Sequence, residues 1–88
     1  MPWFVKIEEG IVHKAAFDQY VPAHKVYVEN LIVKGHKAKT GYWVHRGGGM
    51  LLFEADSMDE AKEIVAQDSL VQNHCIKHVL HQWCVIAE

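Results

Sequence analysis

Apolar residues recur along this chain with two periods, one typical of strands and one typical of helices. Residues 3–7 form a short run rich in aromatic and β-branched side chains, which is stopped by Glu8, Glu9 and Gly10. Such a run favours extended backbone, because these side chains pack well on a pleated surface. The pattern predicts a first strand over residues 3–7, followed by a loop.

A helical period begins near Pro22. Proline suits the first helical position, since the N–H that it lacks would be unpaired there in any case. Val28, Leu31 and Ile32 then recur at helical spacing, and Gly35 is the residue type that most often caps a helix at its C-terminus. These residues predict a first helix from Pro22 to Gly35.

Two further apolar stretches lie on either side of a glycine run. Residues 38–45 and residues 50–55 are largely apolar or aromatic, and Arg-Gly-Gly-Gly stands between them at residues 46–49. Glycine adopts positive φ without strain, as tight turns require. The run lacks the lysine and the following helix of a phosphate-binding loop, so we interpret it as the turn of a β-hairpin.

A clear helix start follows the hairpin. Ser57 and Glu60 have the spacing of a capping box, in which the serine oxygen accepts from a backbone N–H and the glutamate reaches back. The helix that follows carries one apolar stripe, made by Met58, Ala61, Ile64 and Val65. Residues 76–86 then contain many apolar side chains and few breakers, which predicts a long last strand.

The predicted order of elements is β-α-β-β-α-β. This is the order of the ferredoxin-like α+β fold, in which an antiparallel sheet carries both helices on one face. The length of 88 residues suits one domain, so we expect a single domain over residues 1–88.

Both faces of the predicted sheet are apolar. Trp3, Val5 and Ile7 alternate with Phe4 in the first strand, and residues 50–53 are apolar throughout. Two helices cover only one face, and a large exposed apolar patch usually marks an interface. We therefore expect a homodimer whose two sheets pack face to face.

Composition narrows the class of protein. The nine basic and eleven acidic residues are scattered and give a formal net charge of −2, so no basic stripe is present to hold nucleic acid. No apolar run approaches the roughly 18 residues of a membrane span, and the N-terminus lacks a signal-peptide pattern. We expect a cytoplasmic protein that binds no membrane.

Cys75 and Cys84 are too isolated for a disulfide framework and are interpreted as reduced core thiols.

The predicted topology brings chemically useful side chains to one edge of the sheet. The first helix starts at the end where the first strand finishes, and the second helix runs back toward that end. His24 precedes Val28 by one helical turn, and Asp68 continues the apolar face of the second helix. Arg46 and His74 are expected at the same edge. The start of one helix and the end of the other should therefore meet.

The expected pair has the residue types of an acid/base site. A helix N-terminus disfavours a charged imidazole at His24, and a helix C-terminus disfavours a carboxylate at Asp68, while their mutual attraction opposes both effects. We assign His24 as base or acid and Asp68 as its orienting partner or second proton-transfer group. Arg46 and His74 are assigned to substrate binding, with Arg46 as the anchor of an anion. The alternative is that His24 and Asp68 are a helix cap and a structural ion pair, because these features use the same two residue types.

Other residues form no recognised metal or nucleophile motif. On a strand, His74 and His78 would point the same way but lie about 13 Å apart in Cα position. Neither cysteine has the sequence context of a catalytic nucleophile. We expect no metal ion and no cofactor.

Several short segments follow one another in a recognisable order: Pro22-Ala23-His24, Gly35, Gly41, residues 57–61 and Asp68. In order and spacing the chain resembles the YciI-like (YCII-related) family of small dimeric α/β-barrel proteins, over nearly all of its length. The resemblance implies a dimeric barrel and a site made by His24 and Asp68. Ser69 and Leu70 stand where the family usually has proline and an aromatic residue, which bears on the loop around Asp68.

Two classes of function remain open. Relatives in the wider superfamily include a dehydrochlorinase, lactone isomerases and cofactor-free oxygenases, so the resemblance implies a lyase or isomerase acting on a small anionic molecule. The alternative is a non-catalytic ligand-binding or assembly module. A partly apolar pocket that contains both His24 and Asp68 would favour the enzyme, whereas a salt bridge sealed from solvent would favour the module.

Overall fold

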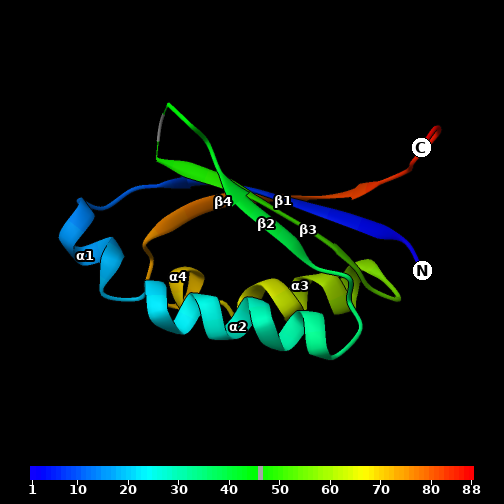
Figure 1. Ribbon diagram of the computed structural model, residues 1–88, viewed down its shortest axis with the longest axis horizontal. Coiled ribbons are helices and arrows are strands. Elements are labelled where there is room, and N and C mark those ends of the chain that lie inside the picture. Colours follow the sequence, from blue (N-terminus) through cyan, green and yellow to red (C-terminus); the bar gives the residue numbers. More distant parts are fainter. Residues whose placement is uncertain (46) are drawn as a thin grey trace.

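The chain forms one antiparallel sheet with its helices gathered on one side (Figure 1). The structure is a computed structural model and describes residues 1–45 and 47–88. In chain order the elements are β1 (Trp3–Gly10), α1 (Lys14–Asp18), α2 (Val21–Val33), β2 (Lys39–Tyr42), β3 (Gly48–Glu54), α3 (Met58–Ala66), α4 (Ser69–Gln72) and β4 (Ile76–Trp83). The predicted ferredoxin-like α+β fold is confirmed, with α1 and α4 as short additions.

The strand order in the sheet is β2-β3-β1-β4, and each neighbouring pair is antiparallel. β1 therefore lies inside the sheet, where Phe4 stands opposite Phe53 of β3 and Gln82 of β4. Successive side chains of a strand point to opposite faces. Because of this alternation, Phe4, Lys6 and Glu8 all lie on the buried face, toward the helices.

Two strand ends differ from the prediction, because partner strands decide them. β1 continues past residue 7 to Gly10, which pairs with Ile76 of β4. β4 ends at Trp83, before the predicted end at residue 86. Trp83 pairs with Trp3, the first residue of β1, so the neighbouring strand offers no further backbone partner.

The two main helices have the predicted caps. α2 is followed by Gly35 at φ 88°, in the left-handed region that glycine adopts without strain. At the start of α3, Oγ of Ser57 accepts from the N–H of Glu60 at 3.1 Å. The Glu60 side chain accepts from the N–H of Asp56 at 3.0 Å, one residue outside the cap position. Within the described residues, no helix is long and apolar enough to cross a membrane.

The hairpin of β2 and β3 brings two backbones into close contact at its glycines. A Cβ on Gly49 would lie 2.1 Å from the carbonyl oxygen of Gly41, and a Cβ on Gly48 would lie 2.5 Å from that of Glu8. The N–H of Trp43 donates to the carbonyl of Gly48 at 2.9 Å and closes the hairpin. The predicted hairpin is therefore present, and only glycine fits at these two positions.

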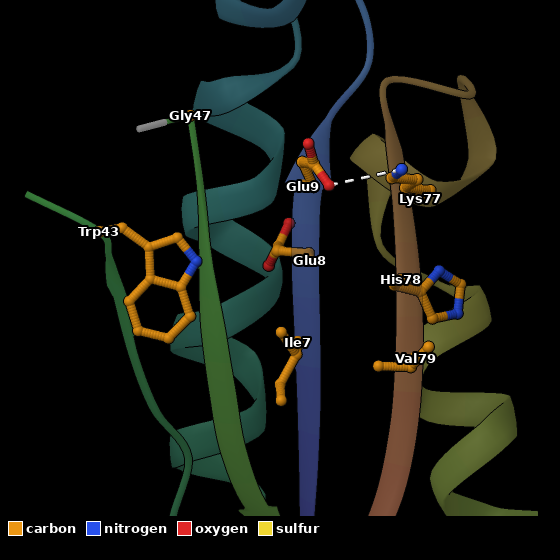
Figure 2. A pocket seen from close by; sticks show the side chains of 8 residues that line it. All are labelled: Ile7, Glu8, Glu9, Trp43, Gly47, Lys77, His78 and Val79. Carbon is orange, nitrogen blue, oxygen red and sulfur yellow. Dashed lines mark ion pairs between the residues drawn. The ribbon is translucent and has the colours of Figure 1, made fainter. Parts of the chain in front are cut away.

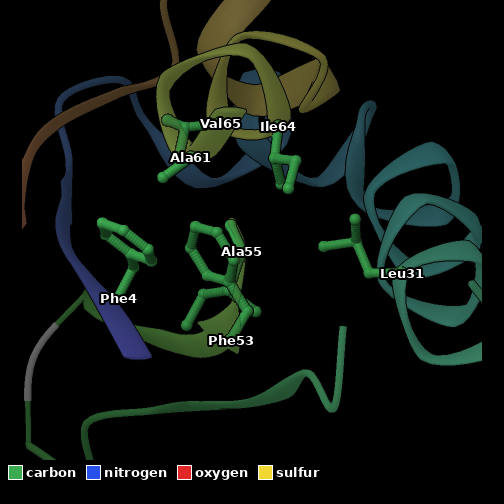
Figure 3. Packing of buried hydrophobic residues seen from close by; sticks show 8 residues of the cluster. Phe4, Leu31, Phe53, Ala55, Ala61, Ile64 and Val65 are labelled. Atoms are coloured by element: carbon green, nitrogen blue, oxygen red, sulfur yellow. The ribbon is translucent and has the colours of Figure 1, made fainter. Parts of the chain in front are cut away.

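The main core lies between the sheet and the two long helices (Figure 3). Phe4 and Phe53 stack across β1 and β3, with ring centroids 5.9 Å apart and an interplanar angle of 29°. Leu31 enters from α2, and Ile64 and Val65 enter from α3. Burial of such side chains stabilises by about 1.5–3 kcal/mol each, so this cluster fixes both helices on the same face of the sheet.

The opposite face of the sheet carries apolar side chains that no helix of the described chain covers (Figure 1). Ile7 is 41% exposed, Val79 is 52% exposed and Trp83 is 48% exposed. Half-buried neighbours on this open face are Trp3, Val5, Met50 and Leu52. The predicted apolar second face is therefore present.

The two cysteines differ in their surroundings. Cys75 is buried, as predicted for a core thiol. Cys84 is exposed, so the prediction of a core position is wrong for this residue. The physical reason is that β4 ends at Trp83, and Cys84 follows it beyond the paired part of the sheet.

Candidate active site

The first turns of α2 and the segment between α3 and α4 meet at a histidine and an aspartate. Nδ1 of His24 lies 2.8 Å from Oδ1 of Asp68. The Asp68 side chain is 0% exposed, whereas the His24 side chain keeps 15% of its surface in solvent. The topology thus brings His24 and Asp68 into direct contact, as the sequence predicts.

Each member of the pair lies at a helix start. Tyr20 is the N-cap of α2, and the N–H of His24 donates to its carbonyl at 3.1 Å. Asp68 follows α3 but is itself the N-cap of α4, where its Oδ1 accepts from the N–H of Leu70 at 3.0 Å. The sequence places Asp68 only at the end of a helix, whereas the structure also makes it the N-cap of a second helix. The short α4, which the sequence pattern did not predict, supplies a backbone donor that favours the charge.

Lys6 of β1 completes a buried cluster that the pattern analysis missed. Nζ of Lys6 lies 2.8 Å from Oδ2 of Asp68 and 3.5 Å from Oε1 of Glu8, and the Lys6 side chain is 0% exposed. Asp68 therefore gives one oxygen to His24 and the other to Lys6. A signal was present, because Lys6 and Glu8 share the strand phase of Phe4. Opposite charges in the buried phase of a strand predict a buried ion pair.

The contacts keep Asp68 ionised in the protein interior. Burial raises the pKa of the Asp68 carboxyl, but the hydrogen bond with His24 and the positive charge of Lys6 outweigh it and lower the pKa from 3.8 to about 2. A carboxylate only accepts hydrogen bonds, so the proton in the contact belongs to Nδ1 of His24. In neutral His24 this tautomer leaves Nε2 unprotonated and able to take up a proton.

Tyr27 borders the pair but does not share its proton chemistry. Its ring centroid lies 6.1 Å from that of His24, and its hydroxyl donates to the carbonyl of Ile64 at 2.7 Å. Burial, and then the negative charges of Asp68 and Glu8, raise the pKa of Tyr27 well above its usual value of 10. Tyr27 therefore stays protonated and ties α2 to α3.

The two predicted substrate-binding residues have different outcomes. Arg46 lies outside the described residues. His74 is exposed and adopts φ 55° in the turn between α4 and β4. Among residues 1–45 and 47–88, no hydrogen bond joins the His74 side chain to His24 or Asp68. A substrate-binding role for His74 stays a prediction.

One cavity, of about 430 Å³, lies on the open face of the sheet (Figure 2). Ile7 and Val79 form its floor, Trp43 stands at one side, and Glu9 and Lys77 form an ion pair of 3.4 Å near one end. This cavity belongs to the face that the helices leave uncovered. Among the described residues, no three His, Cys, Asp or Glu side chains are grouped closely enough to hold a metal ion.

Two other cavities lie on the side of the helices. One of about 470 Å³ is bounded by α3, α4 and β4 and is lined by Met58, Lys62, Val65, Ala66, Val71, His78 and Leu80. Another of about 430 Å³ lies at the end of the sheet beside α1 and is lined by Gly10, Val12, Lys14, Phe17, Tyr42, Gly47 and Gly48. None of these three cavities is lined by His24 or Asp68.

Fold and cluster define a small ferredoxin-like protein with a buried histidine–carboxylate–lysine network. The fold is similar to that of 5-chloro-2-hydroxyhydroquinone dehydrochlorinase (TftG) from Burkholderia phenoliruptrix AC1100, solved in complex with 2,5-dihydroxybenzoquinone. The TM-score is 0.72, the sequence identity is 21%, and the similarity covers 93% of this chain and 93% of that chain. No family model and no curated protein matches the sequence. At this identity the likeness shows a shared fold.

Proposed function

We propose that this protein is a small cofactor-free enzyme that transfers protons on a small anionic organic molecule, as a lyase or an isomerase. His24 is the general base and acid, and Asp68 orients it. The observation that carries the proposal is the 2.8 Å contact between Nδ1 of His24 and a carboxylate that stays ionised although it is buried. A carboxylate in this position fixes the tautomer of a histidine and stabilises the imidazolium that forms during proton transfer.

The reaction starts from neutral His24. Nε2 takes the proton of an acidic C–H bond of the substrate, and the electron pair of that bond forms a C=C bond. In an elimination, an anion leaves the neighbouring carbon with its bonding electrons. In an isomerisation, the electrons of an adjoining C=C bond shift to its far carbon as the new C=C bond forms, and Nε2 returns the proton to that carbon. Asp68 accepts from Nδ1–H throughout and offsets the positive charge on the ring.

The burial of the charges supports a functional role. Lys6, Glu8 and Asp68 are all buried. A buried ion pair commonly contributes no more stability than apolar residues of the same volume, so stability alone is a weak reason to keep it. Ionisable groups with strongly shifted pKa values gather at functional sites.

We propose that the cavity beside α1 holds the anionic end of the substrate, while its reacting carbon reaches the exposed part of His24, which does not itself line the cavity. α1 supplies Lys14 and Phe17 to this cavity and is followed directly by α2, which carries His24. Phe17 and Tyr42 offer aromatic walls, and the Lys14 ammonium, which pairs with Asp18 of the same helix, would have to leave that partner to bind an anion. Arg46 stays the proposed anchor for an anion, because a guanidinium offers a fork of hydrogen-bond donors.

The structural neighbour supports a substrate class. TftG is named as a dehydrochlorinase of 5-chloro-2-hydroxyhydroquinone and was solved with 2,5-dihydroxybenzoquinone. Eliminations of this kind need a base and a site for an anionic ring, and both are among the roles proposed above. We propose small phenolic or quinone-like anions as substrates. We also propose membership of the YciI-like family, which rests on residues 22–24 and Asp68 together with the fold.

A non-catalytic binding or assembly module is the second candidate. Three observations favour it. Asp68 has no solvent exposure, and it pairs directly with both Lys6 and His24. The three cavities described above do not include the pair. In that case the cluster would serve to join β1, α2 and α4.

Ligand contact and turnover distinguish the two candidates. We expect 2,5-dihydroxybenzoquinone to shift the ring resonances of His24 in an NMR titration, and 5-chloro-2-hydroxyhydroquinone to release chloride. His24→Ala and Asp68→Asn should each lower turnover about a hundredfold or more in a folded protein. Lys34→Ala, at the other end of α2, is the matched control.

Two results would replace the enzyme by the assembly module. One is a panel of small phenols, quinones and carboxylates that leaves the His24 resonances unchanged. The other is turnover that stays intact in both His24→Ala and Asp68→Asn.

We further propose that two copies of the chain pack sheet against sheet. The open face presents Ile7, Val79 and Trp83 to solvent, each about half exposed. Apolar surface of this extent is stabilised by burial at about 25 cal/mol per Å². A second copy offers the same apolar face, so a two-fold arrangement covers both at once.

A further inference from the structure

We propose that Lys6 is a positioning residue of this site, whose buried ammonium holds the Asp68 carboxylate in place and sets the charge of His24, with Glu8 acting against it. The benefit of Lys6 to catalysis rests on the proposed function. The electrostatic effect of Lys6 on His24 rests on the geometry of the cluster alone.

Lys6 lies between two carboxylates. Its Nζ is 2.8 Å from Oδ2 of Asp68 and 3.5 Å from Oε1 of Glu8, and its side chain is 0% exposed. A buried ammonium without solvent requires partners of opposite charge. With both carboxylates ionised, the three side chains carry one excess negative charge. Protonation of His24 neutralises that charge.

The neighbouring strands add little charge around Lys6. In the sheet register Lys6 stands between Leu51 of β3 and Leu80 of β4, both apolar. Glu8 stands opposite His78 of β4, which is exposed and titratable. The titration of His78 therefore has to be followed beside that of His24.

The helices contribute the remaining groups. Asp68 comes from the start of α4, and His24 and Tyr27 come from α2. Tyr27 stays protonated, so it carries no charge. Nδ1 of His24 and Nζ of Lys6 contact the two oxygens of one carboxylate, and each contact is 2.8 Å long. The two groups therefore share one carboxylate, so a change of charge at Lys6 is felt at His24.

Removal of the Lys6 charge and removal of the Glu8 charge should change the titration of His24 in opposite directions. Lys6→Met removes the positive charge, so the imidazolium is favoured and the ring resonances of His24 should titrate at higher pH than in the wild type. Glu8→Gln removes a negative charge at nearly constant volume, so the pKa of His24 should fall. Lys34→Met removes a positive charge ten residues along α2, about 15 Å away along the helix axis, and should leave the pKa unchanged.

The measurement is an NMR pH titration of the histidine ring resonances in the full chain. Opposite shifts in Lys6→Met and Glu8→Gln support the proposal, because a general loosening of the structure would move His24 in the same direction in both variants. An unchanged titration in both variants, or shifts of the same sign, would overturn it. If Lys6→Met does not fold, Glu8→Gln alone tests the proposal. A His24 titration that moves to lower pH supports the proposal, and an unchanged titration overturns it.

The titration requires no substrate. A failed search for turnover therefore leaves the positioning role of Lys6 standing, and an unchanged titration leaves the proposed reaction of His24 standing. Once a reaction is found, the acidic limb of the pH profile of kcat/KM should move to higher pH in Lys6→Met, because that limb reports the free-enzyme pKa of the base.

Discussion

At the scale of residues, Asp68 accepts hydrogen bonds both from its neighbours in the chain and from residues distant in sequence. One carboxylate oxygen accepts from the N–H of Leu70, a contact two positions along the chain, and from the ring of His24. The other oxygen accepts from Lys6, far away in sequence. A single charge thus caps α4, fixes the His24 tautomer and neutralises a buried ammonium. Loss of that charge affects all three at once.

The acid stability of the protein should depend on Asp68. Its folded pKa of about 2 lies below the ordinary value of 3.8, so the carboxylate stabilises the fold above about pH 4, and this contribution is lost as the pH falls toward 2. The contribution at neutral pH is about 2 kcal/mol. Urea unfolding between about pH 2 and pH 6 measures it: the free energy of unfolding should fall more steeply with acid in the wild type than in Asp68→Asn.

An exposed carboxylate provides the control for this titration. Asp59→Asn changes a side chain in the first turn of α3 and should keep the acid dependence of the wild type. Parallel curves for the wild type and Asp68→Asn would show that the Asp68 charge does not stabilise the fold.

At the scale of elements, the backbones of β2 and β3 lie so close together in their hairpin that some positions tolerate only glycine. Gly49 lies against the backbone of β2, whereas a Cβ on Gly47 would meet nothing within 4 Å. The two glycines are two positions apart, so they test the same strand connection in different surroundings. The difference in stability between variants at the two positions therefore measures the cost of adding a Cβ where β2 and β3 are in close contact.

We expect Gly49→Ala to destabilise the protein by about 2 kcal/mol or more, because its Cβ would lie 2.1 Å from the carbonyl oxygen of Gly41. Gly47→Ala should cost far less. Urea unfolding at neutral pH compares the two. Equal losses in both variants would contradict the packing of β2 against β3 described here.

The N-terminal cap of α3 offers a second test at this scale. Oγ of Ser57 accepts from the N–H of Glu60, so Ser57→Ala leaves that donor unpaired. The expected cost is about 1 kcal/mol in the free energy of unfolding. Ser57→Asp, which restores an acceptor, should recover most of it. A Ser57→Ala variant as stable as the wild type would show that the cap contributes nothing.

At the scale of the whole molecule, the sheet has one face covered by helices and one face without such cover. The covered face carries the core and the charged cluster, and the open face carries Ile7, Val79 and Trp83. The charged cluster and the proposed dimer interface therefore lie on opposite sides of β1. Changes on the open face should leave the pair His24–Asp68 intact.

Sedimentation at micromolar concentration should give about twice the chain mass of 10.1 kDa. Ile7→Lys places a charge on the open face and should shift the protein to the monomer. Ile32→Lys is the matched control, since Ile32 is 54% exposed but belongs to α2 on the other side of the sheet. A monomeric wild type, or equal behaviour of both variants, would contradict the packing of sheet against sheet.

The sequence by itself determined the elements whose signals are local. The stripe from Val28 to Leu31, the glycine at residue 35 and the capping pair Ser57 and Glu60 predict two helices, because neighbours three and four residues apart share a helix face. The element order then selects one topology, and that topology predicts the contact of His24 with Asp68.

Tertiary structure decided what depends on partners distant in sequence. The ends of β1 and β4 follow from their mutual pairing, as Gly10 with Ile76 and Trp3 with Trp83 show. The charge of Asp68 depends on His24 and Lys6, which come from other elements and together outweigh the effect of burial. Lys6 became part of the site because packing sets which phase of β1 faces the helices. Periodicity is a property of one segment, whereas pairing length, burial and electrostatic surroundings arise only when segments meet.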